Sequence, residues 1–122
     1  MINSTVMGRP YRYAYSALPT EGWFTFEGII KHDVHSGSMQ TYRFSDGTYC
    51  SETVFAPRPD ATSEDDGYLL TYTSDIVNDA SHCMVFDAQN PGDGPIARVR
   101  LPERICSGTH AYWADAGTLV PA

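Results

Sequence analysis

Basic residues are scarce in this chain, where eight Lys and Arg stand against fifteen Asp and Glu and give a net charge of −7. Nucleic acids and anionic membrane surfaces both attract basic patches, so neither is expected as the main partner. No apolar run approaches the roughly 18 residues that a membrane span needs. The N-terminal residues also lack the basic segment followed by an apolar one that marks a signal peptide. A cytoplasmic protein is therefore expected.

Cysteine is also rare, and no stretch of useful length repeats its apolar residues at the helical period. The three cysteines, Cys50, Cys83 and Cys106, are an odd number without metal-type spacing. Free thiols in a reducing compartment are favoured over a disulfide. There is no Gly-x-Ser-x-Gly, phosphate loop, His-Glu-x-x-His or Gly-x-Gly-x-x-Gly motif, so the enzyme classes that these motifs mark receive no support.

What the chain has instead is a series of short β-type runs between turns. It is 42% hydrophobic and 12% aromatic, which is material for a core, and its 122 residues suit one domain or a piece of one. Period-two alternation and β-branched or aromatic content predict strands, and turn residues separate them. The expected strands are 11–15, 23–31, 39–44, 53–55, 68–73, 83–86 and 96–101. An all-β fold follows.

One unit of this pattern occurs twice. Residues 28–33 form a strand that ends in Asp33, and a glycine-containing turn leads to the strand 39–44. Residues 82–87 likewise end in Asp87, and a glycine-rich turn leads to the strand 96–101. Repeats about 50 residues apart are typical of propeller blades built from antiparallel meanders. Because two blades do not close a ring, the repeat is compatible with a fragment of a propeller or with the end of a longer chain.

His110 is the leading candidate for chemistry. It follows Gly108, whose backbone freedom suits a crowded site, and aromatic residues come directly after it. Imidazole is the commonest side-chain metal ligand. On this local pattern alone, a packed or hydrogen-bonded histidine is favoured over a ligand.

Three other histidines receive weaker assignments. His32 and His35 flank Asp33 at an expected turn, where two exposed histidines are favoured over a metal-binding pair. His82 precedes an expected strand and receives no role.

Charged residues elsewhere are mostly expected to face water. The run Glu64-Asp65-Asp66 lacks the ligand spacing of a calcium loop, so a solvated acidic turn is favoured. Arg98 and Arg100 occupy alternate positions of the expected strand 96–101 and should lie on its solvent-exposed face. Glu52 differs because it lies just before an apolar strand, where a carboxylate must be partnered. A buried glutamate can accept a hydrogen bond from the far nitrogen of a metal-bound histidine, although spacing alone does not pair Glu52 with His110.

Several blocks of sequence, in this order, resemble the C-terminal part of the carotenoid cleavage oxygenase family, which includes carotenoid, apocarotenoid and lignostilbene dioxygenases and the retinoid isomerase of the eye. The resemblance covers nearly the whole chain, 1–122. The blocks are Gly8–Tyr15, Ile30–Asp33, Ser51–Pro59, Glu64–Leu70, Phe86–Ala88, Ile96–Pro102 and Gly108–His110.

The resemblance implies the last blades of a seven-bladed β-propeller with a non-haem Fe(II) on its axis. The family holds this iron with four histidines that glutamates orient. His110 matches the last of the four ligands, and Glu52 matches the glutamate of the Ser-Glu-x-x-Phe block. The other three ligands of the family lie upstream of anything present here, and the remaining histidines do not match them.

The resemblance implies oxidative cleavage of a conjugated C=C bond in an apolar carotenoid, apocarotenoid or stilbenoid by O₂. Three positions depart from the commoner pattern and leave the substrate subclass open: Cys106, Thr109 and Ala111 stand where proline, phenylalanine and glycine are frequent. Because one ligand cannot hold catalytic iron, the chain is expected to be inactive alone. The alternative is a catalytically dead, free-standing β-rich module for binding or assembly. Open sheet edges are expected to promote self-association in either case.

Overall fold

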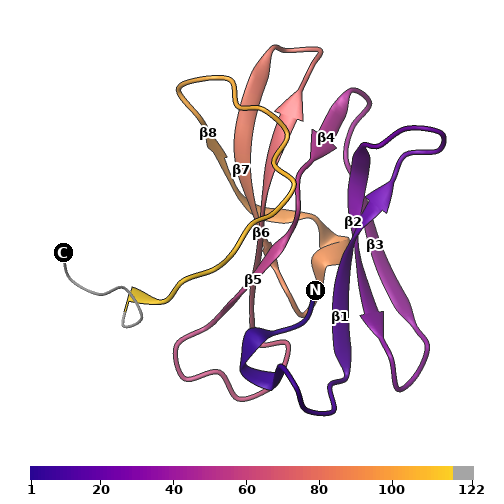
Figure 1. The fold of residues 1–122 in the computed structure, drawn as a ribbon, viewed down its shortest axis with the longest axis vertical. Helices are drawn as coiled ribbons and strands as arrows, with labels where there is room; N and C mark the ends of the chain where they lie inside the picture. Colours follow the sequence, from indigo (N-terminus) through magenta and orange to yellow (C-terminus); the bar gives the residue numbers. More distant parts are fainter. Residues whose placement is uncertain (117–122) are drawn as a thin grey trace.

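The computed structural model describes residues 1–116, which form eight β-strands and two short 3-10 turns (Figure 1). No α-helix occurs among these residues, and none of them forms a helix long and apolar enough to cross a membrane. The elements are η1 (Ser4–Val6), β1 (Tyr13–Pro19), β2 (Phe26–Asp33), β3 (Met39–Arg43), β4 (Thr48–Cys50), β5 (Val54–Pro57), β6 (Gly67–Asp75), β7 (Ala80–Asp87), η2 (Pro91–Asp93) and β8 (Pro95–Arg100).

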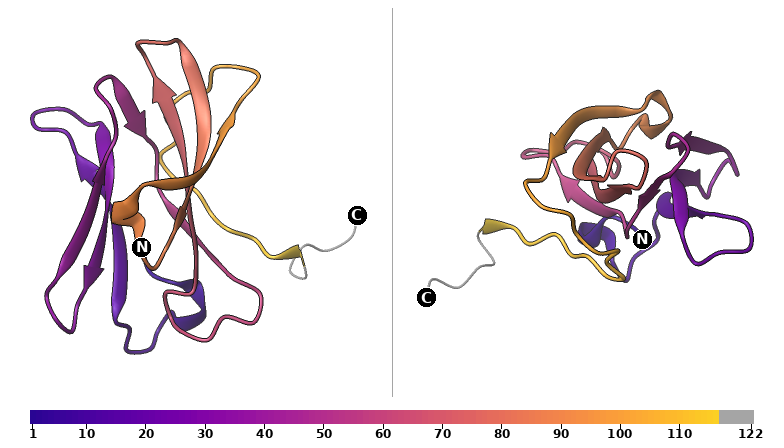
Figure 2. Two further views of the ribbon diagram at one scale, coloured as in Figure 1. Left: turned by 180° about the vertical axis from the view of Figure 1, so that it is seen from behind. Right: turned by 90° about the horizontal axis from the view of Figure 1, so that it is seen from above.

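Every strand pairing is antiparallel, which confirms the expected all-β architecture. The strand order is β1-β2-β4-β6-β7-β8, with β3 also paired to β2 and β5 to β6. The two halves of this sheet meet where β2 pairs with β4 through the single register pair Phe26 and Cys50. The sheet folds over at this point, so that β1, β2 and β3 form one layer and β5 to β8 the other (Figures 1 and 2).

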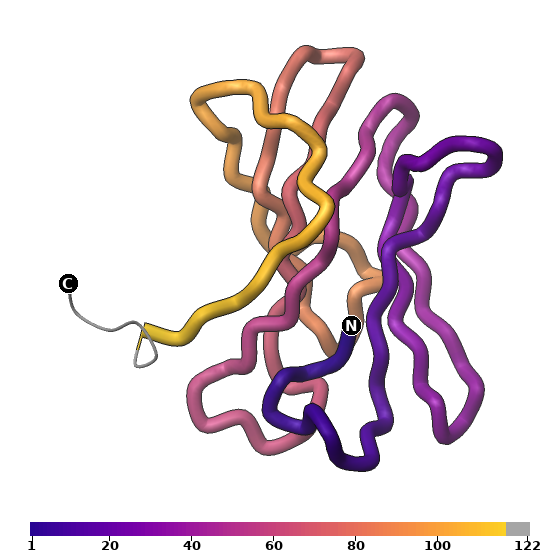
Figure 3. Tube along the Cα trace, viewed as in Figure 1, coloured from indigo at the N-terminus to yellow at the C-terminus, as the bar shows by residue number. Residues whose placement is uncertain are grey.

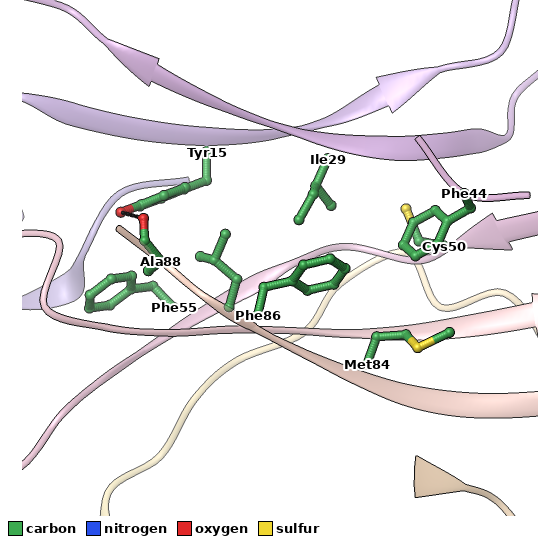
Figure 4. Close-up of a cluster of buried hydrophobic side chains, with 9 residues drawn as sticks. Tyr15, Ile29, Phe44, Cys50, Phe55, Met84, Phe86 and Ala88 are labelled. Carbon is green, nitrogen blue, oxygen red and sulfur yellow. Dashed lines mark hydrogen bonds between the residues drawn. The ribbon is translucent and has the colours of Figure 1, made fainter. Parts of the chain in front are cut away.

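The core lies between these two layers, where aromatic side chains from both meet (Figure 4). The rings of Tyr15 and Phe55 stack with centroids 5.7 Å apart, and Phe44 lies edge-on to Phe86 at 6.2 Å. The Tyr15 hydroxyl donates to the carbonyl oxygen of Ala88 at 3.3 Å, which satisfies the one polar atom that this ring buries. Contacts of this kind join strands that lie far apart in the sequence.

Strand β6 shows why the sequence folds this way. Its residues alternate between buried and more exposed positions along its whole length. Leu69 is fully buried toward the core, whereas Leu70 and Tyr72 face the opposite side and remain partly exposed. The period of two in the sequence therefore becomes the two faces of one strand.

The repeated unit is present as two hairpins, β2 with β3 and β7 with β8. Each first strand ends in an aspartate that caps the turn behind it. The Asp33 carboxylate accepts from the amides of His35 and Ser36, and the Asp87 carboxylate accepts from the amide of Gln89. The same local chemistry thus closes both turns.

Some boundaries differ from the sequence-based prediction. Strand β1 runs over Tyr13–Pro19, whereas 11–15 was expected, and β7 begins at Ala80, three residues before the expected strand 83–86. Strand β4 was not predicted, because its three residues are too short to show an alternating pattern. Trp23 and Phe24 were assigned to a strand but lie in the β1–β2 loop, where their exposed fractions are 78% and 86%.

The prediction of a solvated acidic turn at 64–66 is wrong, because all three carboxylates have partners. Asp65 is buried and accepts from the Lys31 ammonium at 2.6 Å, and Lys31 is only 5% exposed. The Glu64 carboxylate accepts from the backbone amides at the start of β1, and Asp66 pairs with Arg58 at 3.0 Å. The acidic run therefore stabilises the fold by connecting the loop before β6 to β2, to the start of β1 and to Arg58.

Replacing Asp65 by Asn should lower the free energy of unfolding by about 3–5 kcal/mol, because the Lys31 ammonium would stay buried without a counter-charge. Asp60→Asn is the matched control, since Asp60 lies exposed in the same loop with a positive φ that Asn also tolerates. It should change stability by less than about 0.5 kcal/mol. Urea unfolding measures both changes. Equal effects of the two substitutions would contradict a stabilising role of the Asp65–Lys31 ion pair.

The same pair predicts an acid dependence. Burial by itself raises the pKa of Asp65, but hydrogen bonds from Lys31 and Ser63 outweigh it and hold the pKa below the ordinary value. A carboxylate with a lowered folded-state pKa stabilises the fold above its unfolded pKa, near 4, and this contribution is lost as the pH falls through the folded value. Below about pH 4, the free energy of unfolding should thus fall more steeply for the wild type than for Asp65→Asn in urea titrations at stepped pH. Parallel slopes would refute this.

Candidate functional site

Glu52 lies in the short connection between β4 and β5, and neighbouring residues fix the backbone there. The amide of Ser51 donates to the carbonyl oxygen of Tyr72 at 2.9 Å, and the Thr71 hydroxyl donates to the carbonyl oxygen of Ser51 at 3.1 Å. Both partners belong to β6, the central strand of its layer. The Glu52 backbone is therefore held by a rigid element.

Residues 101–116, here called the C-terminal segment, bring His110 to Glu52. The segment leaves β8, crosses the layer of β5 to β8 and runs away from the body of the molecule (Figure 3). Ser81 anchors its beginning twice, because its carbonyl oxygen accepts from the Leu101 amide at 2.8 Å and its hydroxyl from the Ile105 amide at 3.2 Å. The Arg104 guanidinium adds bonds to the carbonyl oxygens of Asp75 and Ala80.

Glu52 and His110 meet where the segment crosses the layer. The Oε2 atom of Glu52 accepts from the Ala111 amide at 2.7 Å and lies 3.5 Å from Nδ1 of His110. The imidazole is 92% exposed, and the carboxylate is 38% exposed. One carboxylate therefore touches both the histidine ring and the backbone just after it.

This geometry suits a metal ligand in one respect. A carboxylate beside Nδ1 favours the tautomer with its proton on that atom, which leaves the lone pair of Nε2 free to coordinate. Within residues 1–116, however, no three His, Cys, Asp or Glu side chains gather closely enough to hold a metal ion. The described part of the chain can thus offer one oriented ligand but not a complete site.

Within residues 1–116, three cavities adjoin Glu52, and two of them are larger than the third. One of about 310 Å³ lies between the C-terminal segment and β5 to β7, with Leu70, Tyr72 and Trp113 in its lining. The other, of about 230 Å³, opens beside β1 and contacts Thr109 and Phe26. Both linings are mainly apolar around the single carboxylate, so apolar groups fit beside the candidate ligand.

The remaining histidines lie away from this place. His35 is exposed in the β2–β3 turn, as expected. The prediction that His32 is an exposed turn residue is wrong, because it belongs to β2 and its Nε2 lies 2.9 Å from the Ser16 hydroxyl. His82 is buried in β7, where burial and the nearby Arg98 and Arg100 lower its pKa. Within residues 1–116, no second histidine joins His110.

The basic strand and the three thiols agree with the sequence-based expectations. Arg98 and Arg100 are exposed on β8. All three cysteines are free: Cys50 is buried, Cys83 half-buried and Cys106 exposed. Burial raises the pKa of the Cys50 thiol to about 11, which makes it unreactive near neutral pH.

Thr71 and Ser81 support the candidate site through hydrogen bonds, and sequence reasoning missed both. Thr71 fixes the backbone ahead of Glu52, and Ser81 anchors the segment that carries His110. The alternation of β6 places Thr71 on the buried face, and a polar residue at a buried position usually has a hydrogen-bonding role. That signal was available for Thr71. Ser81 lay outside the expected strands and gave no such signal.

Comparison with known proteins gives a consistent family. A family model described as retinal pigment epithelial membrane protein, RPE65, matches residues 1–115. The chain is 30% identical over 129 residues to lignostilbene-α,β-dioxygenase isozyme III of Sphingomonas paucimobilis, covering 97% of this chain and 26% of that protein. It is 33% identical over 119 residues to apocarotenoid-15,15′-oxygenase of Synechocystis sp., covering 94% of this chain and 24% of that one. The chain thus spans about a quarter of the length of these relatives.

Solved structures agree with the sequence comparison. A structure of the Synechocystis apocarotenoid oxygenase superposes with a TM-score of 0.88 at 31% identity, covering 94% of this chain and 24% of that one. A cobalt-substituted form of the same oxygenase gives a TM-score of 0.87 at 30% identity, with the same coverage.

Removing the Glu52 carboxylate should release the C-terminal segment at Ala111. A hydrogen bond to a charged acceptor contributes about 1.5–3 kcal/mol, so Glu52→Ala should speed exchange of the Ala111 amide at least tenfold. Hydrogen exchange followed by NMR measures this. Glu103→Ala is the control, because Glu103 is an exposed carboxylate on the same segment. Unchanged exchange in Glu52→Ala would mean that the contact does not hold the segment.

Proposed function

The chain belongs to the carotenoid cleavage oxygenase family, and we propose that residues 1–122 form the C-terminal part of the seven-bladed β-propeller of an iron-dependent dioxygenase. The order of the resembling sequence blocks and the antiparallel hairpins support this placement. The contact of the Glu52 carboxylate with both the His110 ring and the Ala111 amide is the observation that carries the proposal.

The proposed reaction is oxidative cleavage of a conjugated C=C bond in a carotenoid, apocarotenoid or stilbenoid. Relatives bear the names lignostilbene-α,β-dioxygenase and apocarotenoid-15,15′-oxygenase, which fits this class of substrate. The apolar linings beside Glu52 are compatible with such a substrate. Nucleic acid is not a proposed partner, since the chain carries a net charge of −7.

His110 is the proposed ligand of Fe(II), and Glu52 its orienting carboxylate. Bound iron would supply the activation of O₂. This chain would contribute the Nε2 lone pair, the carboxylate that fixes the ring, and apolar walls that keep water from the reacting bond. The relative crystallised in cobalt-substituted form supports a metal site in the family.

The isolated chain is proposed to be inactive, because a single histidine cannot hold catalytic iron. The proposed location is the cytoplasm, which the three free thiols support. A catalytically dead binding or assembly module is the second candidate. The partly exposed apolar residues on β5 to β8 favour it as a description of the chain by itself.

A chimera tests the proposed iron ligand. In it, this chain replaces the matching segment of the Synechocystis apocarotenoid-15,15′-oxygenase, to which it is 33% identical. Iron per chain should be near stoichiometric, and His110→Ala should abolish both bound iron and cleavage of the oxygenase's substrate. Glu52→Gln should weaken metal affinity about 10–100-fold, the usual effect of losing an orienting partner.

His35→Ala is the control for the chimera, because His35 is an exposed histidine remote from Glu52. Its iron content and activity should match those of the unmodified chimera. If His110→Ala retained full iron, the assignment of His110 as a ligand would fail whatever the cleavage rate.

A companion measurement addresses the chain alone. After anaerobic loading with Fe(II), the isolated chain should hold far less than one iron per molecule, and cleavage should be undetectable. Near-stoichiometric iron that disappears in His110→Ala would contradict the proposed inactivity and show that the chain completes a site by another route.

A further inference from the structure

His82 is a buried histidine at the point where β8 gives way to the C-terminal segment. It is 7% exposed, and it opposes Arg100 in the register pair at that end of the β7–β8 hairpin. The next residue along, Leu101, begins the C-terminal segment, and its amide donates to the carbonyl oxygen of Ser81, the neighbour of His82 in the chain, at 2.8 Å. His82 therefore lies where strand pairing ends and the anchoring of the segment begins.

The hydrogen bond of the His82 ring requires its neutral form. Nη2 of Arg98 lies 3.4 Å from Nδ1 of His82. A guanidinium can only donate, so Nδ1 must accept with an unprotonated lone pair. A proton on that atom would remove the bond and leave two N–H groups pointing at each other.

The charges around the ring also oppose a second proton. Burial, and then Arg98 and Arg100 on β8, lower the pKa of His82, whereas Asp75 on β6 raises it to a smaller extent. The Asp75 carboxylate already accepts from the amide and the side chain of Asn78, and it stays 3.9 Å from Nη2 of Arg98. A protonated ring would thus add a positive charge beside two arginines, where the Asp75 carboxylate is already occupied.

The backbone beside this cluster is the one that anchors the C-terminal segment. The Ser81 hydroxyl accepts from the Ile105 amide at 3.2 Å. The Arg104 guanidinium donates to the carbonyl oxygens of Asp75 and Ala80, at 2.9 and 3.2 Å. Movement of the buried ring or of the end of β8 would therefore disturb the hydrogen bonds that hold the segment.

We propose that His82 is a pH switch that holds or releases the C-terminal segment. In the neutral form, its ring accepts from Arg98, and β8 stays paired with β7 up to the start of the segment. Once protonated, the ring repels Arg98 and Arg100, the end of β8 separates from β7, and the segment that carries His110 is released. The inference goes beyond the proposed reaction and does not depend on iron.

Hydrogen exchange of the metal-free chain, followed by NMR from about pH 7.5 to about pH 5.5, tests the switch. The readout is the protection factor of the Leu101 and Ile105 amides, which removes the intrinsic pH dependence of exchange. Because the pKa of His82 is lowered in the closed state, the released state binds a proton more readily, and release is favoured below the ordinary value near 6.5. Both protection factors should fall severalfold, up to about tenfold at the lowest pH.

Two variants remove the switch in different ways. His82→Gln keeps an acceptor for Arg98 but cannot take up a proton, so its protection factors should not change over this range. Arg98→Gln should weaken the pH dependence, because a glutamine side chain can pair with either form of the ring. Arg98 is exposed on β8, so this variant keeps the test decisive even if His82→Gln does not fold.

His35→Gln is the matched control, because His35 is an exposed histidine in the β2–β3 turn. It should keep the wild-type response. Constant protection factors in the wild type would overturn the proposal, and so would a full wild-type response in His82→Gln or Arg98→Gln. None of these results bears on the iron content of the chimera, so the switch and the proposed function fail independently.

Discussion

The Lys31 ammonium is the point at which four separate parts of the chain are joined. It donates to Asp65 ahead of β6 and, at 2.9 Å, to the carbonyl oxygen of Gln89 after β7, and it lies 4.2 Å from the centroid of the Tyr13 ring at the start of β1. A buried cation is costly unless every donor has a partner. Here the partners come from both layers, so the ammonium is satisfied only when the two layers are correctly placed. The pair therefore makes the fold specific as well as stable.

The candidate site depends indirectly on the placement of the two layers. Strand β6 follows directly from the loop that holds Asp65, and its Thr71 fixes the backbone before Glu52. Strand β7 supplies Ser81, which anchors the C-terminal segment. The glutamate and the histidine thus reach each other from two different directions, each guided by hydrogen bonds to the same pair of neighbouring strands. The last step, the placement of the His110 ring, then rests on the Glu52 carboxylate itself.

Much of the fold could be read from the sequence, because it rests on local patterns. Alternation located β6, and the repeated strand-aspartate-turn unit located two hairpins. The three-residue β4 had too few positions to alternate, and the acidic run was assigned to solvent because its partner Lys31 lies 34 positions away. Glu52 and His110 were singled out by a family resemblance, whereas their proximity is a tertiary fact that spacing could not give. Each incorrect prediction therefore concerns either a strand too short to show a pattern or a contact between residues far apart in the sequence.

The graded burial of the three cysteines gives the chain a built-in handle for spectroscopy. Cys106 is exposed, whereas Cys50 is enclosed in the core and Cys83 is half covered. Burial also raises the pKa of both enclosed thiols, so less of each is present as the reactive thiolate. A thiol-directed fluorophore or spin label should therefore react first at Cys106, on the same segment as His110. The native sequence, without any engineered residue, can thus report on the motion of the segment that carries the candidate ligand.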